Sequence, residues 1–122
     1  MDLIQILKAI SDENRIRILN ILSHGDLCVC EIEKVLNINQ SNASRHLNKL
    51  VSSEILKNYK NGLYVYYKIN KDVLDKFSFI SDLLNNEIIK LDKCGQDYEK
   101  LKKYKSKGMS CDSLKEWKNE EE

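Results

Sequence analysis

The most constraining feature of this sequence is a pair of β-prone runs that flank the dipeptide Asn61-Gly62. The runs cover residues 55–60 and 63–69 and are rich in tyrosine and aliphatic side chains. Asn-Gly tolerates the positive φ angles of a type I′ turn and is the strongest short-range signal for a β-hairpin. We therefore predict a hairpin over residues 55–69 with its turn at Asn61-Gly62.

The residues before this hairpin predict two helices joined by a tight turn. Apolar residues at helical spacing predict a short helix from about Cys30 to Leu36, a polar turn over residues 37–39, and a second helix that begins near Gln40. Two short helices of this kind, the second polar and basic on its outer side, are typical of a helix-turn-helix. The expected fold is therefore mainly α (α+β): a winged helix-turn-helix with a two-stranded β wing.

Amphipathic helices are predicted on both sides of this unit. Residues 2–10 and 12–25 each read as one helix, and residues 73–91 carry apolar side chains at steps of three and four, which predicts one long helix. The core of the domain lies earlier in the chain, so we expect the long helix and the first helix to form a two-fold dimer interface. Packing of the long helix on its own domain is the alternative.

Length and composition fit one small globular domain. The chain has 122 residues, of which 42% are hydrophobic and 32% are charged. We expect residues 1–92 to form the DNA-binding and dimerisation domain and residues 93–122 to form a charged C-terminal extension that can be helical as far as Tyr104. No apolar run approaches the ~20 residues needed to span a bilayer, and the N-terminus lacks the pattern of a signal peptide. We therefore expect a cytoplasmic protein with no membrane partner.

Positive charge is concentrated in the middle of the chain. Between Gln40 and Lys68 there are five basic residues and one acid, although the whole chain carries a net charge of only +1. This distribution is expected of a surface that faces DNA phosphates, with chance scatter as the alternative. Amide, hydroxyl and guanidinium groups at the start of the second helix can read base edges or hold phosphates. The residues expected to contact double-stranded operator DNA are Gln40, Ser41, Asn42, Ser44, Arg45, His46, Lys49 and Lys60.

The sequence offers a thiol site next to this interface. Cys28 and Cys30 are separated by one residue at the start of the first helix of the pair. Two thiolates can hold one soft ion such as As(III), Cd(II), Pb(II), Zn(II) or Cu(I), and a helix N-terminus lowers the pKa of a thiol. Residues i and i+2 of a regular helix do not share a face. Joint ligation therefore requires a helix start that is irregular or becomes so on binding, and it would distort the helix that braces the recognition helix.

Two further cysteines are candidates for a third sulfur ligand. Cys94 lies next to Gly95, where we expect a helix to end, and Cys111 follows later in the chain. For each of these two cysteines, a free thiol on the surface or in the core is the alternative. We find no phosphate-binding loop, no dinucleotide fingerprint and no nucleophile–base pair, so we expect no enzyme activity and no catalytic cofactor.

Four segments in this order resemble the ArsR/SmtB family of repressors. They are Ile10-Ser11-Asp12-Glu13-Asn14-Arg15-Ile16-Arg17-Ile18-Leu19, Cys28-Val29-Cys30-Glu31-Ile32, Gln40-Ser41-Asn42-Ala43-Ser44-Arg45-His46-Leu47 and Gly62-Leu63-Tyr64-Val65-Tyr66-Tyr67. The resemblance covers roughly residues 2–92. It implies a homodimeric winged-helix repressor that blocks its own operon until an inducer releases it from DNA.

The cysteine motif is similar to that of family members that sense As(III) or Sb(III), which makes those ions the expected inducers. Arsenic sensors of the family place a third cysteine three residues after the second, where this chain has Glu33. Cadmium and lead sensors add cysteines before the motif, and this chain has none there. The alternatives are a repressor that responds to Cd(II), Pb(II) or Zn(II), a thiol redox-sensing repressor, and a thiol redox protein or metal carrier that binds no DNA.

Overall fold

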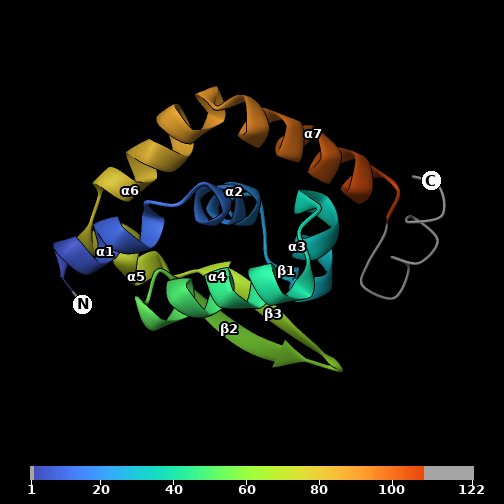
Figure 1. The fold of residues 1–122 in the computed structure, drawn as a ribbon, viewed down its shortest axis with the longest axis horizontal. Helices are drawn as coiled ribbons and strands as arrows, with labels where there is room; N and C mark the ends of the chain where they lie inside the picture. The colour runs from blue at the N-terminus through green and yellow to red at the C-terminus, as the bar shows by residue number, and fades with distance from the viewer. Residues whose placement is uncertain (1, 109–122) are drawn as a thin grey trace.

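The computed structural model describes residues 2–108 and has the predicted winged helix-turn-helix architecture. Helix α2 lies in the middle, helices α6 and α7 pass over one side of it, and α4 lies on the other side with the β-hairpin projecting beyond it (Figure 1). The elements in chain order are α1 (Leu3–Ile10), α2 (Glu13–Leu22), β1 (Leu27–Cys28), α3 (Val29–Leu36), α4 (Gln40–Ser52), β2 (Leu56–Asn61), β3 (Tyr64–Ile69), α5 (Lys71–Lys76), α6 (Phe79–Asp82), a π-helical segment (Leu83–Glu87), a 3-10 turn (Ile88–Lys90) and α7 (Asp92–Ser106).

The turn between α3 and α4 forms where the sequence predicts it. Asn37 ends α3 in the left-handed conformation with φ 54°, which asparagine tolerates better than most residues. Asn39 caps α4, and its side-chain oxygen accepts a hydrogen bond of 2.8 Å from the backbone N–H of Asn42. Apolar side chains of α3 and α4, including Val35 and Leu47, then pack into one core.

A third antiparallel strand adds to the predicted two-stranded wing. Strand β1 pairs with β3 on the side opposite β2, and Cys28 lies opposite Tyr66. A strand of two residues is too short to show an alternating pattern, so the sequence alone did not indicate it.

The turn of the hairpin lies one residue later than predicted. Asn61 pairs with Tyr64, so the connecting residues are Gly62 and Leu63, and of these only Gly62 has a positive φ, of 65°. A glycine in the first central position fits a type II′ turn, so the type I′ turn at Asn61-Gly62 was wrong. The register follows from the pairs farther along the strands, where the rings of Tyr59 and Tyr66 stack at 5.7 Å.

The single long helix predicted over residues 73–91 is also wrong. Helix α5 ends at Lys76, Phe77 leaves helical geometry with ψ 77°, and the chain resumes as α6 and the π-helical segment. The break lets Val73 and Ile80 both enter the core of their own domain, where each is about 1% exposed. Much of the apolar side of residues 73–91 is therefore covered within the chain, which agrees with the alternative that this segment packs on its own domain.

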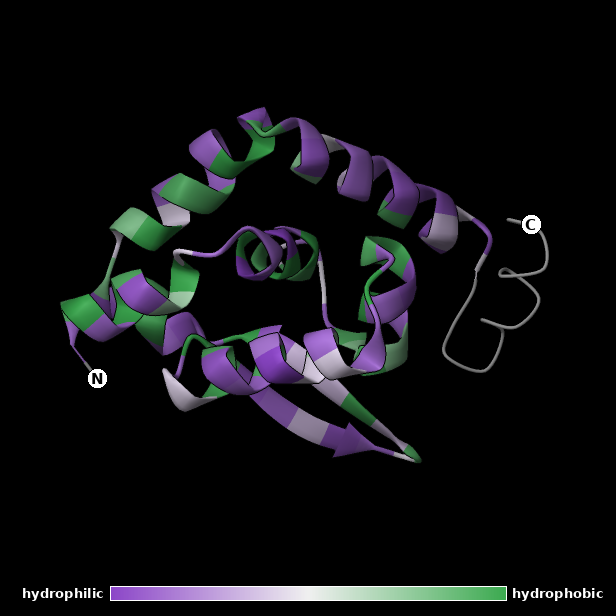
Figure 2. Ribbon diagram, in the orientation of Figure 1, coloured by the Kyte–Doolittle hydropathy of each residue, from purple (hydrophilic) through white to green (hydrophobic). Residues whose placement is uncertain are grey.

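Helix α7 belongs to the same folded unit. It packs on α2 and α3, and its Leu101 and Tyr104 side chains are buried in the core. Figure 2 shows α7 as mainly hydrophilic on its visible surface, in keeping with the few apolar residues it contributes. The predicted charged extension is thus helical through Ser106 and packed against the domain. Across residues 2–108, no helix has the length and apolar character needed to cross a membrane.

Candidate nucleic-acid interface and thiol site

Helix α4 presents a polar, basic side to solvent. Gln40, Ser41, Arg45 and Lys49 are exposed, whereas Asn42 and Ser44 are half-buried at the edges of this side. The guanidinium of Arg45 lies 3.4 Å from the side-chain oxygen of Asn42, a weak contact that leaves most of its N–H groups available. Lys60 is exposed on β2, one residue before the end of the strand at the tip of the wing. These predicted DNA contacts are therefore accessible on one helix and its neighbouring hairpin.

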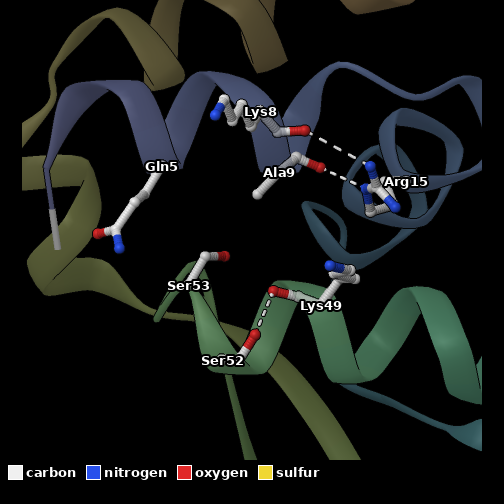
Figure 3. A pocket seen from close by; sticks show the side chains of 7 residues that line it. All are labelled: Gln5, Lys8, Ala9, Arg15, Lys49, Ser52 and Ser53. Carbon is white, nitrogen blue, oxygen red and sulfur yellow. Dashed lines mark hydrogen bonds between the residues drawn. The ribbon is translucent and has the colours of Figure 1, made fainter.

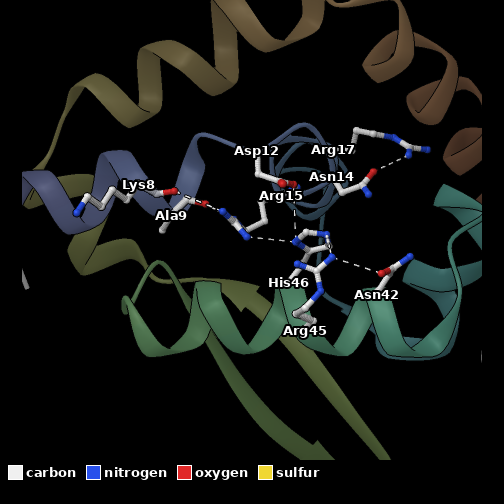
Figure 4. A network of polar contacts seen from close by, with 9 residues as sticks. All are labelled: Lys8, Ala9, Asp12, Asn14, Arg15, Arg17, Asn42, Arg45 and His46. Carbon is white, nitrogen blue, oxygen red and sulfur yellow. Dashed lines mark hydrogen bonds and ion pairs between the residues drawn. The ribbon is translucent and has the colours of Figure 1, made fainter.

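His46 differs from the other predicted DNA contacts because it faces inward and is 2% exposed. Its Nδ1 lies 3.3 Å from a guanidinium nitrogen of Arg15 and 3.7 Å from a carboxylate oxygen of Asp12 (Figure 4). Burial lowers the pKa of His46, and the nearby charges of Arg45 and Arg15 lower it further against the opposing effect of Asp12. The structure thus gives His46 a role in positioning α4, whereas the sequence alone had placed it among the DNA-contacting side chains on the outer side of the helix.

Arg15 is a positioning residue that the sequence did not reveal. Its Nε donates a hydrogen bond of 2.5 Å to the carbonyl of Ala9 at the end of α1, while its other end meets His46 of α4 (Figure 4). One side chain thereby links α1, α2 and α4. Its partners lie 6 and 31 residues away along the chain, so no local pattern marks them.

Cys28 and Cys30 lie on either side of the point where strand β1 becomes helix α3. Cys28 is the last residue of β1 and precedes the helix with extended backbone angles, φ −84° and ψ 166°. Its side chain is fully buried, whereas Cys30 is exposed. The backbone angles of Cys28 are those of an ordinary N-cap residue, so the helix start is regular here and joint ligation would have to distort it. Cys28 is disulfide-bonded in this structure, so it must be reduced before it can act as a ligand.

A buried carboxylate holds this helix start. Glu31 is 4% exposed, and one of its oxygens accepts a hydrogen bond of 3.0 Å from the backbone N–H of Cys28. The other oxygen accepts a short hydrogen bond from the hydroxyl of Tyr104 on α7. Burial and this carboxylate raise the pKa of Tyr104. The pair ties the cysteine segment to the C-terminal helix.

The expectation of a lowered pKa at Cys30 is wrong. Partial burial raises the pKa of the Cys30 thiol, and the negative charges of Glu33 and Glu31 raise it further. Burial, together with these two acids, outweighs the backbone hydrogen bond, which lowers the pKa of Cys30. A metal ion would therefore have to displace the thiol proton itself.

Cys94 is not brought to the other two cysteines. It lies in the first turn of α7, at the start of a helix and not at the predicted helix end. Burial and the charge of Asp97 raise the pKa of Cys94 against the opposing effect of Arg17. Tyr104, the α7 residue that reaches Glu31, is ten positions farther along, which is about 15 Å at 1.5 Å per residue. Cys111 lies outside the described residues. Within the described part of the chain, no three His, Cys, Asp or Glu side chains form a group that could hold a metal.

Comparison with known proteins agrees with this architecture. A model of the family described as "Bacterial regulatory protein, arsR family" matches residues 12–58, from α2 into β2. An arsenical resistance operon repressor from Staphylococcus xylosus is 36% identical over 84 residues, which cover 69% of this chain and 81% of that repressor. The chain belongs to the arsR family. The transcriptional repressor SdpR of Bacillus subtilis is similar to this arsR-family chain at 35% identity over 66% of the chain and 90% of SdpR.

Solved structures share the fold of this arsR-family protein. Reduced HlyU from Vibrio cholerae is 27% identical with a TM-score of 0.58, covering 68% of this chain and 88% of HlyU. A homodimeric winged helix-turn-helix DNA-binding domain from Mycobacterium bovis, 24% identical, gives a TM-score of 0.59 over 73% of this chain and 83% of that domain, and it supports the fold alone. The protein is thus a winged helix-turn-helix transcriptional regulator, and its family is one of DNA-binding regulators, not of enzymes.

Proposed function

We propose that this arsR-family protein is a homodimeric repressor that leaves its operator DNA when As(III) or Sb(III) binds to cysteine thiolates. The observation that carries the proposal is the position of Cys28 and Cys30 on either side of the first residue of α3, the helix that packs on α4. An ion bound there would act directly on the helix that supports the DNA-contacting side chains.

The relatives support both parts of the proposal. Arsenical resistance operon repressors from Staphylococcus xylosus and Staphylococcus aureus are each 36% identical to this chain over the matched residues. The Mycobacterium bovis domain of the same fold is described as homodimeric. In this chain, Leu3, Ile4 and Leu7 of α1 expose apolar side chains, as do Ile89 and Leu91, which is the surface a dimer would bury.

DNA recognition would follow from the exposed side of α4. A recognition helix in the major groove places the residues of its first turns against base edges, here Gln40, Ser41 and Asn42. Arg45 follows one turn later and can bind a guanine edge or a phosphate. The hairpin projects beyond α4, which lets Lys60 reach the backbone.

Ligation would disturb both DNA-contacting parts. Cys28 is buried and Cys30 is exposed, so one ion can bind both sulfurs only if the first turn of α3 opens. Opening breaks the hydrogen bond from the Cys28 N–H to Glu31 and disturbs the pairing of Cys28 with Tyr66. The first change acts on the helix behind α4, and the second acts on the sheet that carries the wing.

The chemistry of As(III) suits thiols whose pKa is raised. Arsenous acid, As(OH)₃, exchanges each hydroxyl for a thiolate: an As–S bond forms, an As–O bond breaks, and the hydroxide leaves as water with the thiol proton. No electrons are transferred. Cys28 and Cys30 would supply two sulfurs. Cys111 is the first candidate for the third, and Cys94 of a second subunit is the alternative, since Cys94 lies far from the pair within one chain.

DNA release can be measured by fluorescence anisotropy with a labelled duplex from the region upstream of the protein's own gene. Reduced protein is titrated onto the duplex, and As(III) and Cd(II) are then added in turn. The variants are Cys28→Ala, which keeps a small apolar side chain in a buried position, and Cys30→Ser, which suits an exposed one. Cys111→Ser and Cys94→Ala, the latter keeping a small apolar side chain in a buried position, test the two candidates for the third ligand.

The expected result is release by As(III) from the wild type, with loss of release in Cys28→Ala and Cys30→Ser. Release that survives in both of those variants would refute the thiolate site. Loss of release in Cys111→Ser or in Cys94→Ala identifies the third ligand. Release by Cd(II) alone would favour a cadmium-responsive repressor. A relative described as a cadmium resistance regulatory protein, a CadC homolog from Staphylococcus aureus, is 37% identical over 59% of this chain and 60% of that homolog.

A thiol redox-sensing repressor is the second candidate, because Cys28 is disulfide-bonded in this structure. HlyU, one of the similar solved structures, is described in a reduced form. In this case peroxide without any metal would release the DNA, and a thiol reductant would restore binding. As(III) added to the fully reduced protein would then have no effect.

A further inference from the structure

A cleft separates α1 from the C-terminal half of α4, with the start of α2 at its back (Figure 3). Its volume is about 370 Å³. The polar side chains that line it are Gln5, Lys8, Arg15, Lys49, Ser52 and Ser53. Three of these side chains are cations and none is an acid, so the cleft has the chemistry of an oxyanion site.

Within the described residues, the two lysines of the cleft are not paired with carboxylates, whereas Arg15 lies near the carboxylate of Asp12. Among residues 2–108, no ion pair is recorded for Lys8 or Lys49, and both are exposed. The guanidinium of Arg15 is held in place by backbone carbonyls, at 2.5 Å from that of Ala9 and 3.4 Å from that of Lys8. Those contacts orient the guanidinium, and the charge of Asp12 offsets part of its positive charge. The cleft therefore combines one fixed cation with two that can move.

The cleft opens beside the side of α4 that would face DNA. Ser41, Arg45 and Ser52 are exposed and follow helical spacings of four and seven residues, so they share one side of the helix. Lys49 lies one turn after Arg45, toward α1, and lines the cleft together with Ser52. When a helix lies in the major groove, the phosphates of the flanking strand run along its side. The cleft lies where such a phosphate would pass.

We propose that this cleft receives a backbone phosphate of the operator, with Lys8 of α1 and Lys49 of α4 as its cationic donors and Arg15 as a fixed charge behind them. The proposal rests on the proposed DNA-binding function and adds α1 to the interface. It also gives the link from Arg15 to α1 a purpose, because that link sets the distance between the two lysines. A free phosphate ion has the same chemistry, and the experiment separates the two sources.

The test measures the dependence of DNA affinity on salt, by fluorescence anisotropy between about 50 and 200 mM KCl. Each phosphate contact contributes about 0.9 to the slope of log K against log salt concentration. With two clefts in a dimer, Lys8→Gln should lower the slope by about 2, so the wild type should lose roughly tenfold more affinity over this range than the variant. Lys8→Arg should keep the wild-type slope. Lys93→Gln, an equal charge change on exposed α7, is the control and should also leave the slope unchanged.

An unchanged slope in Lys8→Gln, with wild-type melting behaviour, would overturn the proposal. So would an increase in melting temperature with inorganic phosphate that is lost in Lys8→Gln without any change of slope, because the cleft would then be a site for a free anion. Absence of DNA binding by the wild type would instead refute the proposed function, which keeps the two failures apart.

Discussion

The buried ion pair between Arg17 and Asp97 gives the sharpest test of how α7 is held. Two guanidinium nitrogens of Arg17 donate to the carboxylate of Asp97, at 2.7 and 3.0 Å. A third hydrogen bond, of 2.7 Å, reaches the carbonyl of Leu36 at the end of α3. Both charged side chains are about 6–7% exposed, so solvent screens them little. The contact joins α2, α3 and α7 at one point.

Replacing Asp97 with alanine should destabilise the fold by about 3–5 kcal/mol, because it leaves a buried guanidinium without its counter-charge. Alanine is a good helix former, so the loss of helix propensity in α7 is not the cause. For a chain of this length, 1 kcal/mol corresponds to about 4 °C in melting temperature, which gives a decrease of roughly 12–20 °C. That is a large fraction of the 5–15 kcal/mol typical of a domain.

The assay is thermal and urea denaturation followed by far-UV circular dichroism, at one fixed protein concentration because a dimer melts in a concentration-dependent way. Asp75→Ala removes an exposed carboxylate from α5 and should change the unfolding free energy by less than about 0.5 kcal/mol. If Asp97→Ala is as stable as this control, the ion pair does not hold α7 and the reasoning fails.

Three further outcomes are expected. Cd(II) should bind more tightly as pH rises from about 6 to about 8, because the raised pKa of Cys30 keeps the thiol protonated at low pH. The affinity for As(III) should depend little on pH, because its hydroxide leaves as water with the thiol proton, and calorimetric titration compares the two ions. Tyr104→Phe removes a buried hydrogen-bond donor from the carboxylate of Glu31 and should lower the unfolding free energy, measured in urea, by about 1–3 kcal/mol. If the variant is as stable as the wild type, that hydrogen bond does not stabilise the fold. Burial lowers the pKa of His46, so protonation of this side chain favours the unfolded chain. The unfolding free energy should therefore fall as pH drops below about 6.5, and it should fall less in His46→Gln. Urea titrations at several pH values measure the difference.

The sequence predicts the helix-turn-helix and wing well because their signals are local. Asn37 and Asn39 each act within a few residues of their own position, one by adopting the left-handed conformation and the other by capping α4. The hairpin is likewise encoded by adjacent β-prone runs. Its exact turn depended on cross-strand pairs, including the stacked Tyr59 and Tyr66, which placed it one residue later.

The remaining features depend on contacts between residues far apart in the chain. Helical spacing from residue 73 to 91 shows which side chains are apolar, but it does not show that Val73 and Ile80 enter one core from either side of a break. The same limit applies to the site. The inward orientation of His46 is set by Arg15 on another helix, and the remoteness of Cys94 from the cysteine pair is set by how α7 packs on α2.

The packing of α7 also has a consequence for how the protein is made. Segment 12–58 is translated before Asp97 and Tyr104, the residues that pair with Arg17 and Glu31 inside it. At synthesis rates of about 5–20 residues per second, Tyr104 is added roughly 2–9 s after residue 58. During that interval the nascent recognition unit carries an arginine and a glutamate whose partners on α7 have not yet been made. A chain terminated early would keep this defect, so a truncated product would be unstable and would compete poorly with the full-length protein for DNA.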